Sequence, residues 1–152
     1  MENNIILIRT NSSNHEFIEL VEALDKDLAI RDGDEHDFYD QFNKITHINQ
    51  VVMAYENGKA VGCGAIKAFD DDSMEVKRMY TPPENRGRGI AGMVLAELEK
   101  WAKENGMKKC MLETGIKQPE AIALYEKCGY RRIPNYGQYE NVENSVCFSK
   151  IL

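Results

Sequence analysis

Two kinds of hydrophobic spacing alternate along the chain. The apolar run 5–10 has the length and composition of a strand, and the polar turn 11–14 after it contains several residues suited to cap a helix. In the helix that follows, apolar residues recur at steps of three and four: Phe17, Leu20, Val21, Leu24 and Leu28. The polar stretch 31–34 should end this helix, and we expect a short second helix over 36–43.

The middle of the chain has the spacing of a strand meander. The segments 50–55 and 60–69 flank an Asn-Gly turn at 57–58, which is the dipeptide most typical of a tight β-hairpin. A third strand is predicted over 74–80, where alternate residues share one face. The two prolines at 82–83 should end it, because proline cannot donate to a strand ladder.

The second half of the chain returns to helical spacing. Helices are predicted over 89–105 and 119–127, and strands over 109–114 and 145–151. This order of elements indicates a mixed α/β fold rather than a regular βαβ repeat. We expect a single twisted, mostly antiparallel central sheet flanked by helices, formed by one domain over residues 1–152.

Composition narrows the classes of function. The formal net charge is −6, which disfavours a nucleic-acid partner. No stretch approaches the roughly 20 continuous apolar residues that cross a bilayer. No basic region precedes the short apolar run near the N-terminus, so neither a secretory signal nor a membrane partner is expected. We therefore expect a cytoplasmic protein, and a homodimer is compatible with these features.

The cysteines do not form a pattern that binds metal. Four are spread along the chain without a CxxC pair or a histidine at ligand spacing: Cys63, Cys110, Cys128 and Cys147. No metal site is therefore expected. Three of them fall in predicted strands, where we expect small buried thiols: Cys63, Cys110 and Cys147.

A glycine-rich segment joins the third meander strand to the next helix. Its residues are Arg86, Gly87, Arg88, Gly89, Ile90 and Ala91. Without a Cβ atom the glycines let backbone N–H groups approach an anion closely, and the unpaired N–H groups at the start of the helix favour negative charge. A pyrophosphate fits that environment.

Two other classes of protein contain a glycine-rich loop ahead of a helix. A P-loop is excluded, because Gly89 is followed by Ile90 and Ala91 rather than by lysine and Ser/Thr. The stretch 87–92 matches the dinucleotide fingerprint Gly-x-Gly-x-x-Gly letter for letter. Hairpin strands precede it, however, where the dinucleotide fold needs a parallel crossover.

The glycine-rich segment and two other stretches of the chain resemble motifs of a known family. The segment 86–91 resembles the Gln/Arg-x-x-Gly-x-Gly/Ala motif of the GNAT superfamily of N-acetyltransferases. The strand ahead of it, 75–80, resembles the family's fourth strand, and 118–130 resembles its Asn-x-x-Ala-x-x-Leu-Tyr-x-x-x-Gly-Phe segment. Two motifs in the family's order are far more specific than one. The resemblance is strong over about 75–130 and compatible in element order elsewhere.

The resemblance implies that acetyl-CoA binds where the fourth and fifth strands splay apart. Met79 and Tyr80 occupy the positions that pair with the pantetheine arm, and the loop amides would hold the pyrophosphate. The guanidinium of Arg86 or Arg88 could add charge-assisted contacts. The family carries an asparagine that contacts the cofactor where this chain has Gln118, which is therefore a candidate that departs from the family pattern.

Transfer of an acyl group to an amine needs a proton acceptor for the amine and a proton donor for the thiolate. Glu75 occupies the fourth-strand position where histone acetyltransferases of the superfamily carry their general base, and Glu113 is the competing carboxylate. Tyr125 matches the tyrosine that protonates the thiolate in many members, although the same residue could simply pack in the core. The oxyanion is expected to meet a backbone N–H near Met79 or Tyr80.

The acceptor is expected to be a primary amine of a small molecule. It should contact the more variable parts of the chain: Asp25, Asp27, Arg31, Tyr39, Phe42 and the aromatic loop 133–139. Two other classes stay open at this point, a non-catalytic acyl-CoA-binding module and a nucleotide-binding oxidoreductase. Turnover of acetyl-CoA with a panel of amines would separate the enzyme from the module, and binding of NAD instead of coenzyme A would favour the oxidoreductase.

Overall fold

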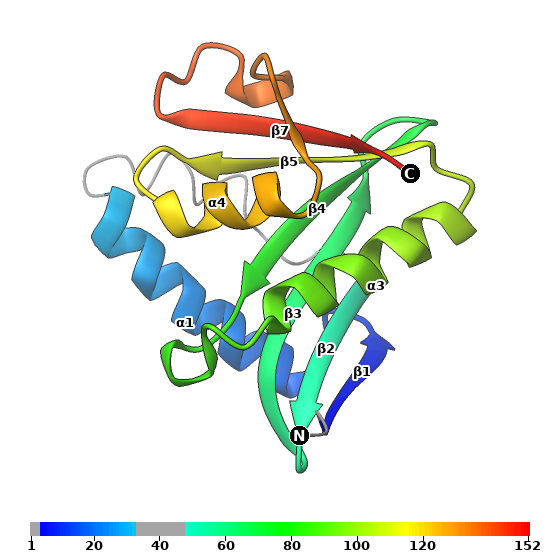
Figure 1. Ribbon diagram of the computed structural model, residues 1–152, viewed down its shortest axis with the longest axis vertical. Coiled ribbons are helices and arrows are strands. Elements are labelled where there is room, and N and C mark those ends of the chain that lie inside the picture. Colours follow the sequence, from blue (N-terminus) through cyan, green and yellow to red (C-terminus); the bar gives the residue numbers. More distant parts are fainter. Residues whose placement is uncertain (1–3, 33–47) are drawn as a thin grey trace.

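The computed structural model describes residues 4–32 and 48–152, which form one sheet with helices on both faces (Figure 1). The strands are β1 Ile5–Thr10, β2 Gln50–Glu56, β3 Lys59–Ala68, β4 Ser73–Tyr80, β5 Lys109–Gly115, β6 Arg131–Ile133 and β7 Ser145–Ile151. The helices are α1 His15–Asp32, α3 Ile90–Glu104 and α4 Pro119–Lys127, with single 3-10 turns η2 Pro83–Asn85 and η3 Gly137–Tyr139. The predicted short helix over 36–43 lies outside the described residues.

The sheet has the strand order β1-β2-β3-β4-β5-β7-β6. Neighbouring strands run antiparallel except for β4 and β5, which are parallel. The predicted fold class, a mostly antiparallel sheet flanked by helices, is therefore confirmed. The short strand β6 was not predicted, because its sequence Arg-Arg-Ile has no hydrophobic alternation.

Each face of the sheet is covered by different helices. On one face α1 places Phe17 and Val21 against the strands, together with Val51 and Met53 of β2. On the other face α3 and α4 pack over the alternate residues of the same strands, such as Val52. Because both faces are covered, β2 is a nearly continuous apolar run rather than an alternating one.

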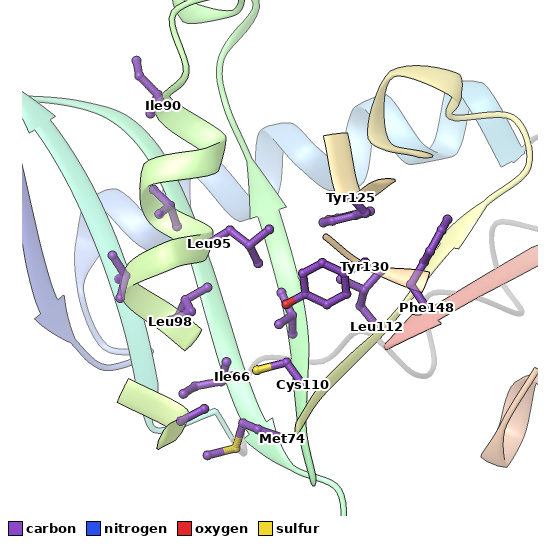
Figure 2. Close-up of a cluster of buried hydrophobic side chains, with 14 of the residues drawn as sticks. Ile66, Met74, Ile90, Leu95, Leu98, Cys110, Leu112, Tyr125, Tyr130 and Phe148 are labelled. Atoms are coloured by element: carbon purple, nitrogen blue, oxygen red, sulfur yellow. The ribbon is translucent and has the colours of Figure 1, made fainter. Parts of the chain in front are cut away.

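Two glycines of β3 allow α3 to lie close to the sheet. A Cβ atom on Gly62 would lie 2.7 Å from Cγ2 of Ile90, and one on Gly64 would lie 2.9 Å from Cδ1 of Leu98. Figure 2 shows the resulting core, in which side chains of α3 such as Leu95 and Leu98 point toward Tyr130 and the central strands. The close approach positions the N-terminus of α3 beside the end of β4.

The cysteine prediction is confirmed. Cys63, Cys110 and Cys147 are buried in the sheet, and all four cysteines are free thiols. Cys128, at the C-cap of α4, is partly exposed. Within the described residues, no helix combines the length and the apolar character needed to span a membrane.

The two central strands part from each other along their length. β4 pairs with β5 only from Ser73 to Glu75, opposite Lys109 to Met111, and neither strand pairs with the other beyond that point. β5 remains paired with β7 along its whole length, and β4 continues to pair with β3 as far as Tyr80. A wedge-shaped opening is therefore built into the middle of the sheet, with Glu75 at its vertex.

A bulge in β4 accompanies this opening. The register with β3 shifts between Lys77, opposite Ala65, and Tyr80, opposite Cys63, so that β4 contains one extra residue. Arg78 within the bulge has φ +58°, a conformation that non-glycine residues rarely adopt. Bulges re-aim side chains and are common beside functional sites. The bulge therefore marks the open part of β4 as a candidate site.

Candidate active site

Two adjoining cavities occupy the opening between β4 and β5. The first, here called the loop cavity, has a volume of about 390 Å³ and lies against the glycine-rich loop and the first turns of α3 and α4. The second, here called the strand cavity, has a volume of about 110 Å³ and lies between the ends of β4 and β5. Five residues line both cavities: Leu24, Met79, Gln118, Ala121 and Tyr125. The two cavities therefore adjoin, and these residues mark their junction.

The residues predicted from the sequence are brought together here. Those that line one or both cavities are Glu75, Met79, Tyr80, Arg86, Gly87, Gly89, Ile90, Ala91, Gln118 and Tyr125. Arg88 is the exception, because it lines neither cavity. Its guanidinium pairs instead with the carboxylate of Glu56 at the end of β2, with Nη1 3.0 Å from Oε1. Only its backbone remains part of the glycine-rich loop.

The loop has the geometry of an anion cradle. Gly87 and Gly89 both have φ +79°, and an ideal Cβ atom on either would meet no atom within 4 Å. Gly89 is also the N-cap of α3, so the first N–H groups of the helix point out of its end without intrahelical acceptors. Two buried polar atoms of residues that line the cavity, Oγ1 of Thr81 and Oδ1 of Asn85, have no hydrogen-bond partner among the described residues. The N–H groups therefore fit an anionic ligand, and the two unpartnered atoms leave room for further polar contacts to it.

Arg86 is held at the mouth of this cradle. Its Nε donates a hydrogen bond to the backbone oxygen of Thr81 at 2.8 Å, and its guanidinium lies 5.7 Å from the centre of the Tyr80 ring. These contacts fix a positive charge at the wall of the loop cavity. Of the two arginines in the motif, Arg86 is the one that lines the loop cavity.

Glu75 lies at the vertex of the wedge, where it is 7% exposed. One carboxylate oxygen accepts a hydrogen bond from the Tyr136 hydroxyl at 2.6 Å, and the other lies 3.5 Å from Nζ of Lys77. Burial and the neighbouring Glu75 carboxylate raise the pKa of Tyr136, so its hydroxyl remains a donor at neutral pH. The carboxylate is thus held by a loop 61 residues away in sequence.

Glu113 on β5 is the second carboxylate of the strand cavity. It accepts a hydrogen bond from the Ser145 hydroxyl at 2.6 Å, across the β5–β7 pairing. The strand cavity is therefore lined by two carboxylates, and each is oriented by a hydroxyl from the C-terminal part of the chain.

Tyr125 of α4 stands at the junction of the two cavities and is 6% exposed. Its ring packs against Tyr130 and Phe148, with centroids 5.9 Å and 6.1 Å away. Burial, and then the negative charge of Glu113, raises the pKa of the Tyr125 hydroxyl, which is therefore protonated at neutral pH. Tyr125 therefore both packs in the core and borders the two cavities.

Gln118 lines both cavities as the N-cap residue of α4. Its side chain makes no capping hydrogen bond to the helix, so the amide is not used to start α4. The departure from the asparagine of the family motif therefore keeps a polar amide beside the junction of the cavities.

The residues predicted to meet the acceptor are placed unequally. Asp27 lines the loop cavity, Tyr139 lines the strand cavity, and Asp25 forms an ion pair with Arg78 at 2.5 Å. Tyr39, Phe42 and the side chain of Arg31 lie outside the described residues.

Sequence reasoning did not select Arg78 and Lys77, which also line the strand cavity. Arg78 has a signal in the sequence, because strict alternation would place it on the face of the apolar Met74 and Val76, yet it is charged. A buried charge at such a position needs a partner.

Comparison with known proteins agrees with this geometry. The model of the Acetyltransferase (GNAT) family matches residues 17–130. An IAA acetyltransferase from Azospirillum brasilense is 32% identical over 139 residues, which cover 90% of each chain. The uncharacterized N-acetyltransferase YjgM from Escherichia coli is 36% identical over 112 residues, covering 72% of this chain and 66% of that protein.

Solved structures show the same fold. A Klebsiella pneumoniae protein provisionally assigned as an acyl-CoA N-acyltransferase is 29% identical and superposes with a TM-score of 0.81 over 97% of each chain. A GNAT family acetyltransferase from Elizabethkingia anophelis, solved with acetyl-CoA bound, is 20% identical with a TM-score of 0.73, covering 99% of this chain and 100% of that one.

The chain therefore belongs to the GNAT family of acetyltransferases. The class of its activity is acyl-CoA-dependent N-acyl transfer, and acyl-CoA is the co-substrate of the family. The reading of the glycine-rich loop as a dinucleotide fingerprint is thereby excluded, in agreement with the antiparallel strands that precede it.

Proposed function

We propose that this protein transfers an acetyl group from acetyl-CoA to the primary amine of a small molecule. The observation that carries the proposal is the junction of the two cavities. The loop cavity has the features of a phosphate cradle, the strand cavity is lined by two carboxylates, and Tyr125 borders both. An acyl donor in the first and an amine in the second would meet at this residue.

The loop cavity is the proposed site for acetyl-CoA. The N–H groups of the loop and of the first turn of α3 would hold the pyrophosphate, with Arg86 adding a charge-assisted contact. The backbone of Met79 and Tyr80 is free of pairing with β5, so it is available to the pantetheine arm. Gln118 is the polar side chain placed to contact the same arm. When bound, acetyl-CoA supplies the thioester carbonyl that the amine attacks.

Glu75 is the proposed proton acceptor. An alkylammonium group with a pKa near 10 must lose a proton before its nitrogen can form the C–N bond. Glu75 lies at the closed end of the strand cavity and is held by Tyr136 and Lys77, so it can take that proton directly or through water. Glu113 is then proposed to orient the amine. The alternative is that Glu113 accepts the proton and Glu75 orients the amine, and variants of the two carboxylates would distinguish these assignments.

Tyr125 is the proposed proton donor. Its hydroxyl is protonated at neutral pH, since the ordinary pKa of tyrosine is near 10 and burial raises it further, and it can give a proton to the sulfur when the C–S bond breaks. A backbone N–H of β4 near Met79 is the proposed donor to the oxyanion, since this part of the strand is unpaired on the β5 side.

The strand cavity, with a volume of about 110 Å³, has room for a short polar molecule, in keeping with the proposed small acceptor. The test is to incubate the purified protein with acetyl-CoA and a panel of small amines, and to follow release of free thiol and the mass of the product. Acetylated amine formed in step with free thiol is expected. Binding of acetyl-CoA without any turnover would instead support the non-catalytic module.

A further inference from the structure

The most buried charge in the strand cavity is the guanidinium of Arg78. Its side chain is 1% exposed, and it lines the cavity together with Lys77 from the same strand. Nη2 contacts Oδ1 of Asp25 on α1 at 2.5 Å, whereas Nε is buried and has no hydrogen-bond partner among the described residues. A buried guanidinium with one monodentate partner leaves much of its desolvation cost uncompensated.

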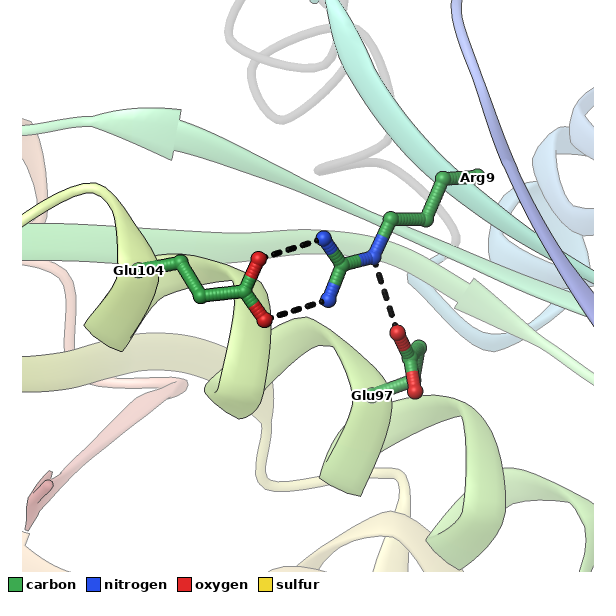
Figure 3. A network of polar contacts seen from close by, with 3 residues as sticks. All are labelled: Arg9, Glu97 and Glu104. Carbon is green, nitrogen blue, oxygen red and sulfur yellow. Dashed lines mark hydrogen bonds and ion pairs between the residues drawn. The ribbon is translucent and has the colours of Figure 1, made fainter.

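A second arginine in the same molecule shows what full coordination looks like. Arg9 donates from Nε to Glu97 and from both Nη atoms to Glu104, so that two carboxylates surround one guanidinium (Figure 3). Yet the side chain of Arg9 is 30% exposed, against 1% for Arg78. Among the residues that the structure describes, the more deeply buried arginine therefore has fewer partners, the reverse of what desolvation alone requires.

The backbone at Arg78 is also unusual. Its φ of +58° places a non-glycine residue in the left-handed region within the bulge of β4. Such a conformation costs about 1–3 kcal/mol and persists where the surrounding structure enforces it, often at ligand sites. The bulge places a charged residue on the wall of the strand cavity, where an apolar residue would satisfy packing at lower cost.

We infer that Arg78 forms an anion subsite in the strand cavity, and that the acceptor is an amine which also carries a carboxylate, as an amino acid does. The inference rests on the proposed function. Arg78 would hold the carboxylate, sharing its N–H groups between Asp25 and the substrate as Arg9 does between two carboxylates. The ammonium end would then face the carboxylates of Glu75 and Glu113 on the walls of the same cavity.

The test compares amines that differ only in charge. Short α-, β- and γ-amino acids are each assayed beside the corresponding primary amide, which keeps the shape and removes the negative charge. We expect kcat/KM for the preferred acid to exceed that of its amide by about tenfold or more, since hydrogen bonds to charged groups are among the stronger ones. Arg78→Gln should remove this preference, and Arg78→Lys should restore part of it.

Asp25→Asn is the matched control, because it breaks the same ion pair from the other side. If Arg78 binds the substrate, freeing it from Asp25 should keep or raise the preference for the acid. If the pair only ties α1 to the sheet, Asp25→Asn and Arg78→Gln should lower stability alike and leave the ratio of acid to amide unchanged. That second pattern would overturn the inference.

The inference and the proposed function can fail separately. Equal turnover of acids and amides by the wild type would refute the anion subsite and leave N-acetylation standing. If no amine is turned over, the anion subsite can still be tested by titrating the protein with propionate and following its NMR chemical shifts. Propionate binding that is abolished by Arg78→Gln would support the subsite. Absence of binding by the wild type contradicts it.

Discussion

Two regions of the molecule, each with an arginine, differ in how fully their polar groups are paired. The closed region surrounds Arg9, and the open region is the wedge between β4 and β5, which contains Arg78. Around Arg9, which joins β1 to α3, three hydrogen bonds to two carboxylates and a contact with the Trp101 ring at 4.9 Å leave the guanidinium fully engaged. Around the wedge between β4 and β5, buried polar atoms of Arg78, Thr81 and Asn85 lack partners among the described residues. The guanidinium of Arg9 is thus fully paired, whereas that of Arg78 is incompletely paired beside a cavity where a ligand is expected.

The difference follows from how the strands are paired. β1 is paired along its length with β2, and α3 covers the adjoining face of the sheet, so side chains there meet other side chains. In the wedge the backbone pairing ends at Glu75, and the two cavities occupy the space beyond it. Function is therefore predicted to be sensitive to changes in the open region and stability to changes in the closed region.

The largest effect is expected from Gly89→Val. The φ of +79° is strained for valine, and the added side chain would occupy the open space of the anion cradle. Loss of two or three charge-assisted hydrogen bonds should weaken binding of acetyl-CoA by about 100-fold or more, as measured by calorimetry. Gly106→Val is the control, since Gly106 also has a positive φ, +81°, and open space but lies after α3, away from both cavities. Similar affinity in both variants would contradict the proposed cradle.

Tyr125→Phe should lower kcat by about 100-fold, because a positioned general acid contributes on this scale. Affinity for acetyl-CoA should change little, since the ring that packs against Tyr130 and Phe148 is retained. Tyr130→Phe removes the hydroxyl of another buried tyrosine from the same cluster, one that lines neither cavity. Parallel loss of kcat in the two variants would indicate packing rather than proton donation.

Glu75→Gln and Glu113→Gln separate the two carboxylates of the open region. Removal of the general base should reduce kcat by about 100-fold in the Glu75 variant, whereas the Glu113 variant should mainly raise KM for the amine. Steady-state kinetics at saturating acetyl-CoA measures both constants. The opposite result would transfer the role of base to Glu113.

A smaller effect is expected from Tyr136→Phe, which deletes the hydroxyl that donates to Glu75 at 2.6 Å and keeps the ring that packs edge-on against Phe69 and Tyr139. Turnover should fall by about tenfold through the loss of one charge-assisted hydrogen bond, while acetyl-CoA affinity stays unchanged. In the Glu75→Gln background the same change should have little further effect on turnover. Additive losses would show that Tyr136 acts independently of Glu75.

The smallest effect on activity is expected in the closed region. Arg9→Met should lower the free energy of unfolding by about 1 kcal/mol, because a partly exposed ion-pair network and a cation–π contact are lost. Turnover should remain at the wild-type level. Denaturant unfolding and the amine assay measure the two quantities, and a large loss of turnover with unchanged stability would break the division into closed and open regions.

Local patterns in the sequence predicted most of the fold. The strand at 5–10 and the helix over 119–127 match β1 and α4 in their bounds, because strand length, proline at the first helical turn and a glycine after the helix are local signals. The sequence did not reveal β6, whose three residues pair with β7 only because the chain returns beside it. Long-range pairing of this kind has no local signature.

The chain's own residues determined the class of the protein, since the glycine-rich segment, the strand before it and the Tyr125 segment carry a pattern that depends on local geometry. Only the tertiary structure decided which of those side chains face the site. Arg88 belongs to the motif, yet its guanidinium is paired with Glu56 at the end of β2. Glu75 acquires Tyr136 and Arg78 acquires Asp25 from segments 61 and 53 residues distant. Such contacts depend on where strands part and helices cross the sheet, which no short stretch of sequence specifies.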